Sequence, residues 1–356
     1  MGGRAEEAGT IDTLQEMLAA GHEQVTYFYD EASGLRAIVA IHSTRLGPAL
    51  GGCRVWPYES EAAALNDVLR LSRGMTYKNA AMGLPLGGGK AVIISDPFTE
   101  KTPALFEAFG RAVERLGGRY ITAEDVGTEP ADMVAVNSQT KHVVGLPSTS
   151  GDPSPATAFG VFSGMKAALE HAFGSGDVRG RRVAVQGLGA VGTHLCEFLH
   201  EGGAQLVVTD ISQARIDHAV SAFGATAVAA SDIYDVDCEV FAPCALGAVV
   251  NDDTLPRLKV RVIAGSANNQ LAEARHGEAL QARGIVYAPD FIINGGGVIN
   301  VADELKPGGY DHDRAYAQVA QIGAKVARAL KLADERGISS AAAAEIMADE
   351  RLKAAE

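Results

Sequence analysis

Arg182-Val-Ala-Val-Gln-Gly-Leu-Gly-Ala-Val-Gly192 is the stretch of sequence that decides the fold. A short apolar strand runs directly into a Gly-x-Gly-x-x-Gly pattern, and a helical stretch follows. In this setting Gly187 permits a tight turn, Gly189 lets a pyrophosphate approach the backbone, and Gly192 lets helix and strand pack closely. The pattern predicts a dinucleotide-binding turn with the phosphates at the positive end of the helix. The simpler alternative is that the glycines only tighten a strand-to-helix turn.

An acidic residue ends the next predicted strand, 205–210. Asp210 stands 18 positions after Gly192, near the usual distance for holding the adenosine ribose hydroxyls. A 2′-phosphate would be repelled there, so Asp210 favours NAD. The nearest cation in sequence, Arg215, is expected a turn into the following helix and not beside Asp210.

Strands and helices alternate around this motif. Strands are expected at 182–186, 205–210, 240–242, 260–264 and 285–288, with helices at 154–173, 191–199, 213–223 and 271–283. Such alternation predicts a Rossmann-type, doubly wound parallel sheet. Helices at 314–336 and 339–353 close the chain.

The part of the chain before this sheet is also predicted to mix helices and strands. A hairpin is expected over 26–43, helices over 61–74 and 106–116, and strands over 90–95 and 120–122. Pro147, Gly151, Pro153 and Pro155 crowd together, as at a domain crossing. We therefore predict two α/β domains: a substrate, catalytic and oligomerisation domain over 1–146, joined by 335–356, and an NAD-binding domain over 147–334.

Composition excludes several classes of function. The chain has 356 residues, 47% of them hydrophobic, and a formal net charge of -13, which disfavours nucleic acid and membrane partners. The 4 cysteines and 9 histidines show no metal-ligand spacing, so no metal is expected. Residues 1–10 lack the apolar stretch of a signal peptide, and a cytoplasmic location is expected.

Three charged residues lie in settings unlike those of solvated surface residues. They are Lys78, in Gly74-Met-Thr-Tyr-Lys78, Lys90, in Leu86-Gly-Gly-Gly-Lys90, and Asp125, in Ile121-Thr-Ala-Glu-Asp125. The glycines before Lys90 do not form a phosphate-binding Walker loop, because Leu84 and Ala91 replace its required Gly and Ser/Thr. A lysine buried beside a second cation can act as a base near neutral pH. The alternatives are a structural salt bridge for the lysines and a turn or cap for Asp125.

These motifs together resemble the glutamate/leucine/phenylalanine/valine dehydrogenase family, and most closely its members that act on branched-chain amino acids. The resemblance extends over nearly the whole chain. It runs through Leu46–Arg54, Gly74–Lys78, Leu86–Lys90, Tyr120–Gly127, Pro153–Pro155, Gly187–Gly192, Ala242–Gly247, Ala264–Gln270, Tyr287–Phe291 and Asn300–Asp303.

The resemblance implies reversible, NAD-dependent oxidative deamination of an L-amino acid. It implies that Lys78 binds the substrate carboxylate, Lys90 activates water and Asp125 carries protons to and from the amino group. The implied cofactor residues are Thr157, Gly187, Leu188, Gly189, Ala190, Val191, Gly192, Asp210, Cys244, Ala245 and Asn268. Asn268 would also touch the substrate, with Asn269 as an open alternative, and Gly51 and Gly52 would offer backbone near its carboxylate. A homo-oligomer, with an octamer as one option, is implied as well.

The side-chain pocket implied by the family contains only uncharged residues. They are Leu50, Met75, Ala123, Val298 and Val301. A second carboxylate would find no partner there, so leucine, valine or isoleucine is expected. One alternative is an aromatic amino acid such as phenylalanine, which the methyl group of Ala123 should crowd, and another is a catalytically silent NAD sensor. A 2-hydroxy-acid dehydrogenase is disfavoured because no histidine lies in a matching motif.

Overall fold

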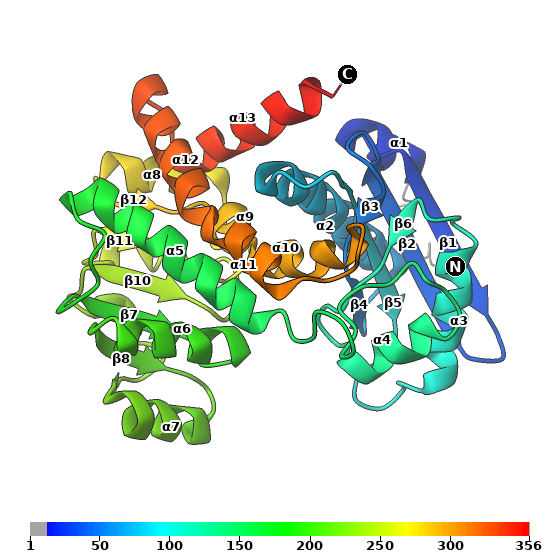
Figure 1. The fold of residues 1–356 in the computed structure, drawn as a ribbon, viewed down its shortest axis with the longest axis horizontal. Coiled ribbons are helices and arrows are strands. Elements are labelled where there is room, and N and C mark those ends of the chain that lie inside the picture. The colour runs from blue at the N-terminus through cyan, green and yellow to red at the C-terminus, as the bar shows by residue number, and fades with distance from the viewer. Residues whose placement is uncertain (1–12, 356) are drawn as a thin grey trace, which may run out of the picture. The chain divides into compact units, whose positions relative to one another are not determined.

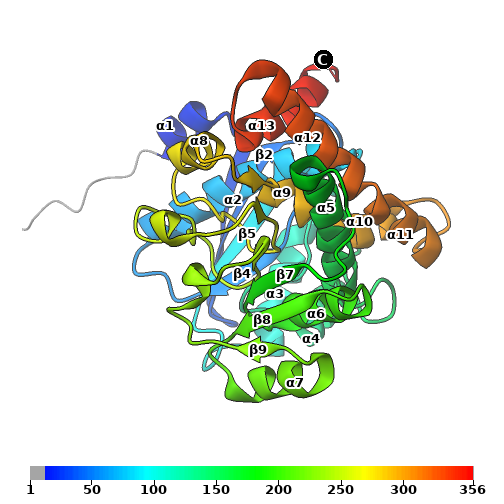
Figure 2. The ribbon, with the colours of Figure 1, turned by 90° about the vertical axis from the view of Figure 1, so that its left-hand side faces the viewer.

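The computed structural model describes residues 13–355, which form two compact units (Figures 1 and 2). The first contains the chain up to Asn79 together with Pro85–Leu146, and the second contains Ala80–Leu84 and the chain from Pro147 onward. The stretch 1–10, where we expect no signal peptide, lies outside the described residues.

The first unit is a mixed sheet with helices. Its elements are α1 Thr13–Ala20, β1 Gln24–Asp30, β2 Leu35–Ser43, β3 Ala49–Leu50, β4 Cys53–Trp56, α2 Glu61–Met82, β5 Gly87–Ile94, α3 Pro103–Glu114, β6 Tyr120–Ile121 and α4 Pro130–Asn137. The strand order is β1-β2-β5-β3-β6, and β4 also pairs with β5. The β1, β2 and β5 pairs are antiparallel and the others parallel, and β1 with β2 forms the predicted hairpin.

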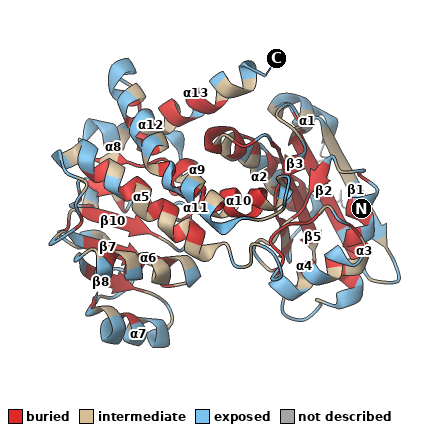
Figure 3. Ribbon diagram, viewed as in Figure 1, coloured by how far each residue is buried: buried red, intermediate tan, exposed pale blue. Residues whose placement is uncertain are grey.

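Each face of this sheet is covered by apolar side chains from a helix, and Figure 3 shows the buried residues in β2 and β5. On one face Phe106 and Phe109 of α3 pack in a cluster with Ile93 of β5. On the other, Leu65 and Val68 of α2 pack with Val92. Because neighbouring residues of a strand point to opposite faces, Lys90 lies on the same side of β5 as Val92, which α2 covers.

Two predicted boundaries in this unit are wrong. The helix expected over 61–74 continues through Gly74 to Met82, because Ser72, Thr76 and Asn79 are fully buried and anchor it. The strand expected from Lys90 begins at Gly87. A Cβ atom on Gly87, Gly88 or Gly89 would overlap Ser43, Thr76 or Tyr120 respectively, so these glycines are strand residues at crowded positions.

The second unit contains the predicted parallel sheet. Its elements are α5 Ser154–Phe173, β7 Arg182–Gln186, α6 Ala190–Glu201, β8 Gln205–Thr209, α7 Gln213–Phe223, β9 Thr226–Ala227, η1 Ile233–Asp235, β10 Val240–Pro243, η2 Leu255–Arg257, β11 Val262–Ile263, α8 Ala274–Ala282, β12 Val286–Tyr287, α9 Asp290–Ile293, α10 Gly296–Ala302, η3 Asp303–Leu305, α11 His312–Ala320, α12 Ile322–Arg336 and α13 Ser340–Lys353. All pairs are parallel, in the order β12-β11-β10-β7-β8-β9. The connections reverse direction between β7 and β10, which is where open sheets of this type bind ligands.

The C-terminal helices differ from the prediction in two ways. The helix expected over 314–336 is two helices that meet at Gln321, and the second packs closely on α5, where Gly160 and Gly164 make room for Ile322 and Val326. From the sequence we predict that residues 335–356 belong to the first domain. In the structure α13 contacts α12 and α8 of the second unit, because its buried alanines need an apolar surface. No helix among residues 13–355 has the length and apolar character needed to cross a membrane.

Candidate active site

Lys90 is a buried lysine in the first sheet, with only 5% of its surface exposed. It lies in β5, where it pairs with Ala40 of β2. Its Nζ atom lies 3.0 Å from Oδ2 of Asp125. The structure therefore brings together two of the three residues that the sequence selected.

Asp125 lies in a tight turn after β6. Its backbone N–H donates to Oγ1 of Thr128, and that hydroxyl donates to the backbone carbonyl of Asp125, at 2.9 and 2.7 Å. Gly127, with φ of +81°, completes the turn at a position where a Cβ atom would overlap the carbonyl of Val55. The turn thus fixes the backbone from which the carboxylate reaches Lys90.

A third charged residue joins this pair, and sequence analysis gave it no role. Nε of Arg54 lies 3.0 Å from the same Oδ2 atom of Asp125. Burial alone would raise the pKa of Asp125, but the charges of Lys90 and Arg54 outweigh it and hold the pKa below its ordinary value. The only available signal was that Arg54 ends one of the family motifs, Leu46–Arg54.

Lys78 is half-buried on α2, and the helix that carries it is anchored by a row of buried polar side chains. Asn79 donates to the carbonyl of Gly87 at 2.6 Å, at the start of the strand that contains Lys90. Thr76 lies one turn earlier, hydrogen-bonded to His42 at 2.8 Å. These contacts join α2 directly to β5 and β2, so the helix of Lys78 is fixed against the strand of Lys90. Sequence reasoning missed this row because its partners are distant in the chain.

The predicted substrate residues of the first unit gather around two glycines. A Cβ atom on Gly51 would overlap the carbonyl of Gly89 and lie 3.2 Å from Cγ of Met75, and one on Gly52 would lie 2.9 Å from Cβ of Asp125. Only glycine permits this close approach of backbone to the charged pair. The Gly51 N–H donates to the carbonyl of Ile121. Leu50 directly precedes Gly51 and is buried, and the carbonyl of the half-buried Ala123 accepts from the N–H of Cys53 at 2.8 Å, directly after Gly52.

The glycine motif forms the turn between β7 and α6, at the point where the sheet reverses direction. Gly187 has φ of +97°, and a Cβ atom there would lie 2.6 Å from Cβ of Ala245. A Cβ atom on Gly192 would overlap the carbonyl of Gly187, whereas the space around Gly189 is open. Gly189 precedes the helix, which begins with Ala190 and Val191, and no side chain caps its N-terminus. Open space beside free helical N–H groups fits a bound pyrophosphate.

Asp210 closes the other side of this turn. Its carboxylate accepts hydrogen bonds from the backbone N–H groups of Leu188, at 2.6 Å, and Ser212, at 2.8 Å. The expectation for Arg215 is wrong, because its Nη1 atom lies 3.8 Å from Oδ1 of Asp210. One turn of α7 brings the exposed side chain back over the carboxylate. On the β10 side, the N–H of Cys244 donates to the carbonyl of Gln186 at 2.7 Å.

The remaining predicted residues lie beyond the ends of β11 and β12 and on α5. Oγ1 of Thr157 would lie 2.7 Å from a Cβ atom on Gly297, directly before Val298, and Val301 is one turn further along α10. Oδ1 of Asn268 accepts a hydrogen bond of 2.8 Å from Asn294. Asn294 is a second residue that the sequence did not select, and it restricts the orientation of Asn268. The neighbouring Asn269 has φ of +50°.

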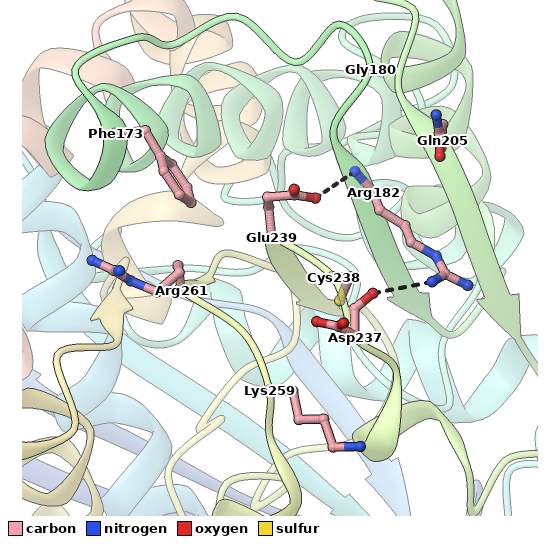
Figure 4. A pocket seen from close by; sticks show the side chains of 9 residues that line it. All are labelled: Phe173, Gly180, Arg182, Gln205, Asp237, Cys238, Glu239, Lys259 and Arg261. Atoms are coloured by element: carbon pink, nitrogen blue, oxygen red, sulfur yellow. Dashed lines mark hydrogen bonds between the residues drawn. The ribbon is translucent and has the colours of Figure 1, made fainter.

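The opposite, amino-terminal edge of the parallel sheet also has a hollow, of about 440 Å³. It is lined by Phe173, Gly180, Arg182, Gln205, Asp237, Cys238, Glu239, Lys259 and Arg261. Its charged side chains do not converge: Figure 4 shows Lys259 and Arg261 pointing in different directions. We therefore place no site there. Within residues 13–355, no group of three or more His, Cys, Asp and Glu side chains could hold a metal ion.

Comparison with known proteins gives matches over nearly the whole chain. Residues 22–142 match the Glu/Leu/Phe/Val dehydrogenase dimerisation domain, and residues 150–219 and 210–356 match Glutamate/Leucine/Phenylalanine/Valine dehydrogenase. The chain is 56% identical to leucine dehydrogenase of Geobacillus stearothermophilus, over 96% of this chain and 94% of that protein. It is 49% identical to phenylalanine dehydrogenase of Bacillus thermotolerans, over 96% and 91% of the two chains. The crystal structure of L-tryptophan dehydrogenase from Nostoc punctiforme is similar with a TM-score of 0.83 and 44% identity, covering 96% of this chain and 99% of that one.

Proposed function

Because the chain belongs to the Glu/Leu/Phe/Val dehydrogenase family and is an amino acid dehydrogenase, we propose that it oxidises L-leucine, L-valine and L-isoleucine to their 2-oxo acids and ammonia with NAD. The observation that carries the proposal is the buried ion pair of Lys90 and Asp125 beside Gly51 and Gly52. A basic and an acidic group are thus held together next to glycine backbone that carries no side chain of its own.

Each step of the reaction has a proposed residue. Lys78 binds the substrate carboxylate, and Asp125 takes a proton from the amino group as the Cα–H bond breaks. When bound, NAD accepts the hydride from Cα. Lys90 then activates the water that attacks the resulting iminium carbon, and Asp125 returns a proton to the departing nitrogen. A short path for protons between Asp125 and Lys90 follows from the 3.0 Å separation of Nζ and Oδ2.

The proposed NAD site consists of the Gly187–Gly192 turn, Asp210, Cys244, Ala245, Thr157 and Asn268. The support is the open space at Gly189, the uncapped N-terminus of α6 and the carboxylate of Asp210 at the end of β8. Arg215 offers a positive charge near Asp210, but 55% of its side chain is exposed and its nitrogen lies 3.8 Å away. We therefore propose that the carboxylate dominates and that NAD is preferred over NADP.

The choice of substrate rests on the uncharged side chains of the proposed pocket. Leu50, Met75, Ala123, Val298 and Val301 offer no partner to a second carboxylate. The 56% identity to a leucine dehydrogenase supports an aliphatic substrate, and the 49% identity to a phenylalanine dehydrogenase shows how close the aromatic alternative lies. One methylene group in such a pocket changes specificity by only about 10- to 200-fold, so overlap is expected.

We also propose that the protein is a homo-oligomer, with an octamer as one option. The first unit matches a dimerisation domain, and its edge strand β1 carries the exposed Tyr27 and Tyr29. Light scattering measures the number of subunits directly.

The test is a spectrophotometric screen of the twenty amino acids with NAD and with NADP. We expect the highest kcat/KM with leucine and NAD, and loss of turnover with intact NAD binding in Lys90→Ala. Highest activity with phenylalanine would move the enzyme to the aromatic group, and equal efficiency with NADP would contradict the role of Asp210. A Lys90→Ala variant that keeps the wild-type rate would show that Lys90 is not the base.

A further inference from the structure

We infer that Arg54 is a positioning residue for the reaction: it holds one oxygen of the Asp125 carboxylate beside Lys90 and leaves the other oxygen for the substrate nitrogen. This inference rests on the proposed function, in which Asp125 exchanges protons with that nitrogen. It assigns a role to a residue that touches Asp125 without being a proposed substrate or cofactor contact.

The geometry at Asp125 is one-sided. Nε of Arg54 and Nζ of Lys90 both lie 3.0 Å from Oδ2. Within residues 13–355, the hydrogen bond from Arg54 and the closest approach of Lys90 both fall on Oδ2, no hydrogen bond to Oδ1 is found, and 22% of the side chain is exposed. Two donors on one oxygen fix the rotation of the carboxylate, so the second oxygen points consistently away from them.

Strand pairing explains how Arg54 reaches this position. It lies in β4, whose Cys53 and Val55 are fully buried in the core, so Arg54 projects from the opposite face. β4 runs parallel to β5, with Arg54 paired to Val92, two residues beyond Lys90. Arg54 and Lys90 therefore lie on the face of the sheet that α2 covers.

The guanidinium of Arg54 is itself held from α2. Its Nη1 atom donates to Oδ2 of Asp67 at 2.9 Å, and the hydroxyl of Tyr58 donates to the same oxygen at 2.7 Å. Arg70 donates to the other oxygen of Asp67 at 2.9 Å. The planar guanidinium thus bridges two carboxylates, which the single nitrogen of a lysine cannot do in the same way.

Electrostatics gives this bridge a measurable effect on Asp125. The ionisable groups that interact with Asp125 are Lys90 of β5, Arg54 and Cys53 of β4, Tyr58, and Tyr120 of β6. Burial raises the pKa of Cys53, Tyr58 and Tyr120, so these three remain neutral near pH 7. Burial also acts to raise the pKa of Asp125, and only the two cations oppose it. Without Arg54, the pKa of Asp125 rises toward the value that burial favours.

The test compares Arg54→Met, Arg54→Lys and the control Arg119→Met. Arg119 is a half-exposed arginine of the same unit that pairs with Glu23 at 3.1 Å. For Arg54→Met we expect kcat with leucine to fall about 10- to 100-fold and the acidic limb of kcat/KM to move up by about one pH unit. Arg54→Lys should show a smaller shift of the acidic limb than Arg54→Met, because lysine restores the positive charge. The KM for NAD and the Arg119→Met profile should stay within about twofold of wild type.

A second readout separates this inference from the proposed function. The carboxyl carbon of Asp125, labelled with carbon-13 and assigned by comparison with Asp125→Asn, is titrated by NMR in wild type and Arg54→Met. A titration midpoint at higher pH in Arg54→Met supports the inference even if no amino acid is oxidised, an outcome that would overturn only the proposed function. An unchanged midpoint together with an unchanged acidic limb overturns the role of Arg54. If Arg54→Met does not fold, the acidic limb and the titration midpoint are measured in Arg54→Lys instead. Wild-type values of both in Arg54→Lys would contradict the need for a bridging guanidinium.

Discussion

Asp125 and Asp303 are two aspartates with the same kinds of charged neighbour, but they differ in how many hydrogen bonds their carboxylate oxygens accept. Each contacts one lysine and one arginine: Lys90 and Arg54 for Asp125, Lys306 and Arg314 for Asp303. Burial acts to raise the pKa of both carboxyl groups, and the cations hold both below the ordinary value. Charge alone therefore does not distinguish them.

The two carboxylates differ in how the donors are distributed over their two oxygens. Oδ1 of Asp303 lies 2.8 Å from both Lys306 and Arg314, and Oδ2 accepts from Arg314 at 2.6 Å and from the backbone N–H of Asp311 at 2.9 Å. Its side chain has no exposed surface, whereas that of Asp125 is 22% exposed and has both donors on one oxygen. A carboxylate whose two oxygens both accept hydrogen bonds within the protein has a structural role, whereas one with an oxygen left over can still accept a hydrogen bond from a ligand.

The largest expected effect is on the rate of Asp125→Asn. The amide cannot take up a proton from the substrate, so kcat should fall about 10³-fold. Rates with leucine and NAD are compared at a temperature at which circular dichroism shows wild type and variant folded, because loss of a partner for the buried Lys90 also lowers stability. Asp303→Asn is the matched control, and equal loss of kcat in both folded variants would contradict the distinction between the two sites.

Asp303→Asn should instead lower the free energy of unfolding. The substitution removes the charge that joins η3 to α11, leaving Lys306 and Arg314 without an anionic partner. Because about a third of each of these two side chains is exposed, water compensates in part, and we expect a loss of about 3 kcal/mol.

Urea unfolding at fixed protein concentration measures this loss. Asp313→Asn is the control on the same helix, since the Asp313 side chain is fully exposed. A stable Asp303→Asn variant with reduced kcat would show that Asp303 belongs to the active site.

The nucleotide-binding turn could be predicted from sequence because its determinants are local. A strand, three glycines and the start of a helix lie within eleven consecutive residues, and the partner acid follows the next strand. The sheet and its reversal between β7 and β10 follow from the alternation of elements, which short-range patterns encode.

The features that sequence missed depend on contacts between distant residues. The role of Arg54 depends on the pairing of β4 with β5. The length of α2 depends on the hydrogen bonds that Ser72 and Thr76 form with His22 and His42. The Gly87–Gly89 run is a strand only because Ser43, Thr76 and Tyr120 occupy the space of its missing side chains. The contact of Arg215 with Asp210 depends on a side-chain conformation that the sequence does not determine.

His42 sharpens the comparison, because it is a buried ionisable group that is stable only without its charge. Its Nε2 lies 3.1 Å from the carbonyl of Ala20, to which it donates, and its Nδ1 forms a hydrogen bond of 2.8 Å with the hydroxyl of Thr76. Burial, followed by the nearby His22 and Arg73, lowers the pKa of His42 from 6.5 to about 4, against the opposing effects of the Ala20 carbonyl and the Glu23 carboxylate. Between pH 6.5 and about 4, His42 is therefore mostly protonated in the unfolded chain and mostly neutral in the folded chain.

This contribution to stability is complete above pH 6.5 and is lost as the pH falls toward 4, by about 2 kcal/mol on reaching pH 5. Urea midpoints of wild type, His42→Asn and the exposed control His218→Asn, measured from pH 4.5 to 7.5, test it. His42→Asn should be less stable than wild type at pH 7.5 but should lose less stability on acidification, because asparagine cannot take up the proton. A slope in His42→Asn as steep as that of wild type would assign the acid sensitivity to another group and leave the carboxylates as the candidates.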